Sequence, residues 1–236
     1  MNRTMQLVCA WCAPVFLATL VIGYGLAAHF IPPPSAGYSA QQVAQIFRDR
    51  TGEIRAGMLL MMVGSLFLVP WNAVIFVQVK RIEGARPVLA YTQLIAGALL
   101  AVEILLPSVM WSAIAFRPER APEITQMVSD TAFLLFIWAF APPMMQALAI
   151  ALAIFNDKGP DQVLPRWAGY LLMGIAVGLI PGGLITFFKT GPFAWDGAIG
   201  WWLTLACAGT MWSMMTYVLI RAVKNDREPE AEGALR

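Results

Sequence analysis

Six long apolar runs, separated by short polar stretches, dominate the pattern of the chain. The runs cover approximately residues 7–28, 56–79, 88–113, 131–155, 167–188 and 198–221. Crossing a hydrocarbon core about 30 Å thick takes roughly 20 apolar residues in a helix. Each run is long enough, and Lys, Arg and Asp are absent from them except at their very ends. We therefore predict an all-α integral membrane bundle of about six transmembrane helices.

The first run has to be separated from a secretory signal. Arg3 precedes it, and Leu26-Ala27-Ala28 resembles a cleavage site. The apolar run is longer than the roughly 7–15 residues of a signal peptide. We therefore interpret it as a retained helix. The expected organisation is one membrane domain over residues 1–224, followed by a disordered cytoplasmic tail over 225–236 that is rich in Glu and poor in apolar residues.

Composition supports a membrane protein and excludes several classes of function. Hydrophobic residues make up 59% of the chain and charged residues only 13%, whereas soluble domains have about 25% charged residues. The net charge of +2 and the scattered basic residues argue against nucleic acid as a partner. A single histidine, His29, is too few for haem, di-iron or His-rich zinc sites. The sequence thus identifies no metal site and leaves any cofactor unknown.

Basic residues predict the orientation. With the N-terminus inside, ten of the sixteen fall on the inner side. They are Arg3, Lys80, Arg81, Arg86, Lys158, Arg166, Arg221, Lys224, Arg227 and Arg236. Lys and Arg near span ends favour the cytoplasmic side. We expect both termini in the cytoplasm, in a cell membrane of the bacterial inner-membrane type.

The first external loop has helical signals of its own. Ser39 and Gln42 form a capping-box pattern that opens a short helix. Val43, Ile46 and Phe47 then share one face at spacings of three and four residues. Such a helix could lie on the membrane surface or cover the end of the bundle. A solvated connector remains the alternative.

Glu103 is the one acidic residue inside a predicted span. A carboxylate at that depth costs roughly 2.5–3.5 kcal/mol on insertion scales, so it is a candidate functional group. It could couple transport to protons or hydrogen-bond a ligand. It could also be a protonated side chain that joins two helices. The spans contain no Lys, Arg or His that would pair with it.

Prolines interrupt most of the predicted spans. Each one removes a backbone donor and frees the carbonyl four residues earlier. The candidate helix breaks are Pro70, Pro107, Pro142, Pro143 and Pro181. Trp71, Asn72 and Gln146 lie near them. Broken helices with adjacent amides form mid-membrane sites in many transporters, although inert bundles contain them too. We take Glu103, Asn72, Gln146 and Trp71 as candidates for substrate binding or proton coupling.

Two further patterns have simpler explanations. Gly174, Gly178 and Gly182 recur every four residues and predict close helix packing, either within the chain or with another one. Cys9 and Cys12 have redox-motif spacing but lack the strand-turn-helix context that this chemistry needs. We expect the two cysteines to pack or to bind a soft metal, and we propose no redox role.

Three functions remain open at this stage. The first is a permease for a small hydrophobic or weakly polar solute, coupled to protons through Glu103. The second is a non-catalytic subunit that stabilises a larger membrane complex. The third is a lipid-modifying membrane enzyme, although the chain has no nucleophile elbow, P-loop or His-Glu-x-x-His motif. Expected partners are membrane lipids and, in the second case, other subunits or further copies of the chain.

Overall fold

The computed structural model describes residues 3–159 and 161–226, and all regular structure in this part of the chain is helical. Six helical segments are long and apolar enough to cross a membrane. These segments confirm the predicted all-α bundle of six spans. Most of the tail expected over 225–236 lies outside the described residues.

Each of the six spans except the third consists of more than one helical piece. Span 1 contains α1 (Arg3–Ala10), α2 (Cys12–Leu20) and η1 (Val21–Ala27). Span 2 contains α4 (Thr51–Ser65) and α5 (Leu68–Glu83), and span 3 is α6 (Val88–Phe116). Span 4 contains α7 (Pro122–Phe133), η2 (Leu134–Trp138) and α8 (Ala141–Asn156). Span 5 contains α9 (Arg166–Leu179) and η3 (Ile180–Phe187), and span 6 contains η4 (Ala198–Leu203) and α10 (Thr204–Asn225).

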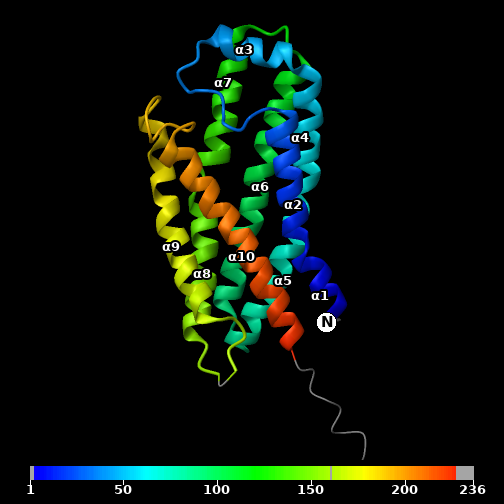
Figure 1. Ribbon diagram of the computed structural model, residues 1–236, viewed down its shortest axis with the longest axis vertical. Coiled ribbons are helices and arrows are strands. Elements are labelled where there is room, and N and C mark those ends of the chain that lie inside the picture. Colours follow the sequence, from blue (N-terminus) through cyan, green and yellow to red (C-terminus); the bar gives the residue numbers. More distant parts are fainter. Residues whose placement is uncertain (1–2, 160, 227–236) are drawn as a thin grey trace, which may run out of the picture.

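Figure 1 shows these spans as an elongated bundle, with α10 crossing the other helices at an angle. Residue 3 and the end of α10 lie at the same end, which we call the terminal end; the opposite one is the far end. At the far end, spans 2 and 4 extend well beyond their predicted limits. Hydropathy detects only the apolar part of a helix, whereas backbone hydrogen bonds continue through polar residues as far as Thr51 and Pro122.

The central helix α6 is capped by charged side chains from both ends of span 2. At its N-terminus, the Glu83 carboxylate accepts hydrogen bonds from the backbone N–H groups of Leu89 and Ala90, at 2.9 and 2.7 Å. At its C-terminus, the Arg55 guanidinium donates to the carbonyl of Ala115 at 2.7 Å. An anion at the N-terminus and a cation at the C-terminus of a helix both interact favourably with its macrodipole. Span 2 therefore fixes α6 along its axis.

The helix α3 (Ala40–Asp49) covers the far end of the bundle (Figure 1). Its predicted capping box is confirmed, since Gln42 N donates to Ser39 Oγ and Ser39 N donates to Gln42 Oε1. Val43 and Phe47 are buried, and the helix packs on α7. The loop is therefore a packed cap rather than a solvated connector.

The candidate proline breaks differ in effect. Between η2 and α8 the helix stops for Ala139 and Phe140, immediately before Pro142 and Pro143. At Pro181 the α-helix gives way to a 3₁₀ segment. Pro70 lies in the first turn of α5 and follows a turn in the chain.

Pro107 lies inside α6, which continues through it to Phe116. The Ser108 hydroxyl there donates to the carbonyl of Ile104 at 2.7 Å. The third span is thus unbroken despite its proline.

Spans 1 and 2 cross at two glycines, Gly23 and Gly57. A Cβ atom on either residue would collide with the carbonyl oxygen of the other. Small residues allow this kind of close backbone approach between membrane helices. By contrast, Gly52 in the same helix α4 has open space where its side chain would be.

We predict opposite effects for alanine at these two positions. Gly57→Ala should destabilise the protein by about 1–3 kcal/mol, because the backbones must move apart. Gly52→Ala should be neutral or slightly stabilising, because alanine is the better helix former. Thermal unfolding of the detergent-solubilised variants measures both. Equal midpoints for the two variants would contradict this crossing.

The orientation predicted from the basic residues can be tested with two cysteine variants. Gln41 on α3 is exposed at the far end, and Ala85 is exposed in a terminal-end loop. In intact cells a membrane-impermeant maleimide should label Gln41→Cys, whereas Ala85→Cys should need permeabilisation. The parent chain is the blank, because its three cysteines lie within spans. The reverse labelling pattern would place the termini outside.

Candidate functional site

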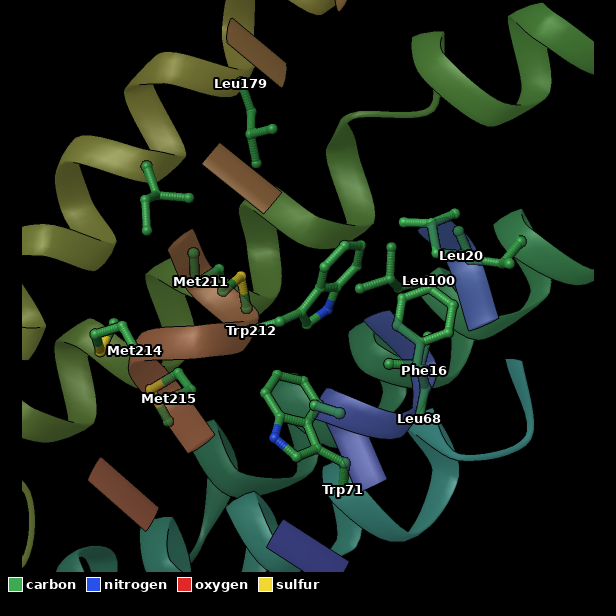
Figure 2. Packing of buried hydrophobic residues seen from close by; sticks show 14 of the residues in the cluster. Phe16, Leu20, Leu68, Trp71, Leu100, Leu179, Met211, Trp212, Met214 and Met215 are labelled. Atoms are coloured by element: carbon green, nitrogen blue, oxygen red, sulfur yellow. The ribbon is translucent and has the colours of Figure 1, made fainter. Parts of the chain in front are cut away.

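A cavity of about 80 Å³ lies inside the bundle. Its wall comes from spans 1, 3, 4, 5 and 6, while span 2 contributes nothing to it. Figure 2 shows five of the apolar wall residues, Leu20, Leu100, Leu179, Met211 and Trp212, which converge from α2, α6, α9 and α10. The cavity is therefore shared by five spans, and it is partly open.

Glu103 is the only acidic residue in the wall, and no Lys, Arg or His of the described chain joins it. Its side chain is 8% exposed. It forms neither a hydrogen bond nor an ion pair with any described residue, yet its carboxyl oxygens are not completely covered. Buried carboxyls in proteins normally have partners. Glu103 is an exception, and what it faces is the cavity.

A proline inside α6 changes the backbone hydrogen bonding at the same place. Pro107 has no N–H, so the main-chain carbonyl of Glu103, four residues earlier, lacks its usual helical donor. Pro143 lies in the first turn of α8, where its missing N–H costs no helical bond, and Ala139 lies just before that helix; both residues line the cavity. The main-chain group that Pro107 leaves without its donor is thus a hydrogen-bond acceptor.

Aromatic rings form much of the remaining wall. Tyr24, Phe136 and Trp201 form a group in which the ring centroids of Tyr24 lie 5.1 Å from Phe136 and 5.6 Å from Trp201. Trp212 and Phe140 belong to the wall as well. Other protein atoms cover the Tyr24 hydroxyl and the indole N–H groups of Trp201 and Trp212, and none of the three has a hydrogen-bond partner. These side chains therefore present ring carbon to the cavity.

The three rings of this group come from segments with π-helical geometry. Tyr24 lies in η1, Phe136 in η2 and Trp201 in η4. π-Helical turns are rare and occur frequently at functional sites. Three of them around one cavity favour a functional role for it.

Asn72 and Gln146 lie in a different cluster, closer to the terminal end. Gln146 Nε2 donates to Asn72 Oδ1 at 2.5 Å and to Gln93 Oε1 at 3.5 Å. Gln93 Nε2 donates to the backbone carbonyl of Asn72 at 3.4 Å. All three side chains are at least 98% buried and join α5, α6 and α8. The cluster leaves room only for glycine at position 97, where a Cβ would collide with the Asn72 amide.

The four candidate residues therefore do not form one site. Asn72 and Gln146 do not line the cavity, and neither does Trp71, which is fully buried with an unpartnered indole N–H. The sequence reasoning did not identify Gln93 or the aromatic wall. Nothing in the local pattern separates Tyr24, Phe136 or Trp201 from ordinary core aromatics, so only the three-dimensional arrangement reveals them.

The glycine stripe faces a helix of the same chain. A Cβ on Gly178 would lie 2.7 Å from Cys207 Sγ, and one on Gly182 would lie 3.5 Å from Thr204 Oγ1. Both neighbours belong to α10. At Gly174 the space is open.

The thiols of Cys9 and Cys12 are free and partly exposed. Within residues 3–159 and 161–226, no three His, Cys, Asp or Glu side chains gather as a metal site requires.

A second hollow, of about 980 Å³, opens at the terminal end between α5, α9 and α10. Arg81, Arg221, Lys224 and Asp161 contribute to its polar wall. Arg81 is paired with Asp226 at 2.8 Å. The hollow is wide and polar, and it is separate from the cavity at Glu103.

The fold and the six apolar spans define the class: this chain is a polytopic integral membrane protein of the helical-bundle type. Comparison with protein-family models, with curated proteins and with solved structures found no match. Its function must therefore be argued from the cavity itself.

The amide cluster leads to a prediction about stability. Gln146→Met keeps the length of the side chain but leaves Asn72 Oδ1 and Gln93 Oε1 without their shared donor. We expect a loss of about 1–2 kcal/mol, in the upper range for interhelical bonds in membranes. Leu152→Met on the exposed face of α8 is the control and should have no effect. Chemical or thermal unfolding in detergent gives the comparison, and equal stability of both variants would contradict a structural role for the cluster.

Proposed function

We propose that this protein is a permease for a small solute, coupled to protons through Glu103. The observation that supports it best is the unpartnered carboxyl of Glu103 at the wall of a cavity formed by five of the six spans. Placing an ionisable group in the membrane is costly, and such groups mark ion and substrate pathways. In this proposal Glu103 holds the proton and the cavity holds the solute.

There is little support for the alternative in which a protonated Glu103 joins two helices through a hydrogen bond. Such a joint would require a hydrogen bond to a neighbouring helix, and Glu103 makes none among the described residues. The amide cluster of Asn72, Gln93 and Gln146 provides a joint of this kind elsewhere. A carboxyl that stabilises no contact is better explained by a reversible partner, such as a proton or a solute.

The helix breaks offer a route for opening. Span 4 is interrupted at Ala139 and Phe140, and span 5 changes its helical geometry at Ile180, beside the cavity. In many transporters, broken helices form the binding site, and the bundle rocks around it. We propose that movement at these two positions exposes the cavity to one side of the membrane at a time. The bias of the basic residues supports a cytoplasmic terminal end.

The other two functions have weaker support. A subunit of a larger complex would need surfaces for a partner, and the glycine stripe was the candidate for one. Two of the three glycines face α10 of the same chain, and Trp201 and Trp212 are buried inside the bundle. A lipid-modifying enzyme would need an acid–base partner for Glu103, and the cavity wall provides none among the described residues.

The permease proposal predicts solute-driven proton movement. Proteoliposomes containing the protein and an internal pH dye should be given small cationic, neutral and anionic solutes in turn. At least one solute should change the internal pH, because its movement exchanges with a proton on Glu103. Glu103→Gln should abolish the change while keeping the unfolding midpoint within a few degrees. Glu123→Gln, at an exposed acid of α7 outside the cavity, is the matched control and should behave as wild type.

Two outcomes would contradict the proposal. One is a panel in which no solute moves protons with the folded wild-type protein. The other is an undiminished response from Glu103→Gln.

A further inference from the structure

From the chemistry of the cavity we infer that its ligand is a small alkylammonium ion of about the size of tetramethylammonium. This inference rests on the proposed permease function and specifies the substrate class of the same site. Three properties of the wall support it: its charge, its aromatic surface and its volume.

The charge of the wall selects a cation. Glu103 is its one acid, and no basic side chain of the described residues lines the cavity. Pro107 leaves the carbonyl of Glu103 without its usual helical donor. A carboxylate and a carbonyl oxygen stabilise a positive charge and repel an anion. An anionic ligand is therefore excluded by the wall.

The aromatic surface favours a cation without N–H donors over a neutral ligand that needs hydrogen bonds. Tyr24, Trp201 and Trp212 carry donor groups, but other protein atoms cover these groups. A neutral ligand with a carbonyl group would thus find few donors in the wall. Ring surfaces attract alkylammonium ions through their quadrupoles, as in the aromatic cages that bind methylated amines. The group of Tyr24, Phe136 and Trp201 provides such surfaces from three spans.

The volume limits the size of the ion. The cavity measures about 80 Å³, whereas a cavity that holds one water molecule measures roughly 10–15 Å³. The space therefore holds several waters, and a compact ion that displaces them, such as tetramethylammonium, matches it. Large lipophilic cations exceed it in the conformation described here.

These properties also define how the ion and the proton exchange. Glu103 carries either a proton or, as the carboxylate, the bound ion, and the cavity remains neutral in both states. The entry of one monovalent cation therefore releases one proton. Tyr24 is the other titratable group in the wall, and its hydroxyl is covered.

The test is equilibrium binding of tetramethylammonium to the purified full-length chain, followed by calorimetry. tert-Butanol, which has a similar shape and no charge, is the comparison ligand. We expect tetramethylammonium to bind at least tenfold more tightly than tert-butanol. Glu103→Gln should remove this preference. Glu123→Gln should retain it.

Two substitutions at Tyr24 separate the ring from the hydroxyl. Tyr24→Phe keeps the aromatic surface and should bind as wild type, because the hydroxyl is covered and has no partner. Tyr24→Leu should weaken binding roughly 3- to 30-fold through the loss of the ring. If Tyr24→Leu does not fold, the comparison between the two ligands still decides the inference. Equal affinity for tetramethylammonium and tert-butanol, or a preference unchanged in Glu103→Gln, would overturn it.

The failure of this inference is distinguishable from the failure of the permease proposal. If neutral solutes such as tert-butanol move protons in proteoliposomes and tetramethylammonium does not, the permease stands and the cationic substrate is wrong. If tetramethylammonium binds through Glu103 but no solute moves protons, the site stands and the transport function is wrong.

Discussion

In a hydrocarbon environment every backbone polar group must find its partner within the protein, and this constraint governs the whole structure. It explains why the described chain is helical. It also explains why the ends of α6 are capped by Glu83 and Arg55 of span 2. With both ends of α6 fixed, the depth of Glu103 near its middle is fixed as well. The same constraint makes a missing donor informative, and Pro107 removes one beside the cavity.

The bundle divides into a scaffold and a site. Span 2 caps α6, crosses span 1 at Gly23 and Gly57, and contributes Asn72 to the amide cluster. It does not touch the cavity. The other five spans form the cavity wall, and several of them change helical geometry beside it. A stable frame next to irregular helices is what a membrane protein with a moving part requires, because motion needs weak points in an otherwise satisfied backbone.

Much of the fold could be predicted from the sequence because hydropathy and capping are local signals. The six spans and the capping box at Ser39 follow from residues that are neighbours in the chain. Glu103 could also be identified, since an acid in an apolar run is conspicuous at any position. The sequence suggested Glu103, Asn72, Gln146 and Trp71 as candidates for one kind of site, but the structure does not bring Glu103 together with the other three. The sequence could not show this, because depth along a span does not tell which side of the helix a residue faces. Tyr24, Phe136 and Trp201 could not be predicted at all, since a cavity depends on long-range packing.

The central claim is that Glu103 exchanges a proton for a bound cation. Infrared difference spectroscopy of the purified protein, with and without tetramethylammonium, tests this exchange most directly. The account predicts that a protonated-carboxyl band disappears and a carboxylate band appears when the ion is added, and that neither change occurs in Glu103→Gln. Binding of the ion without any change in these bands would contradict it.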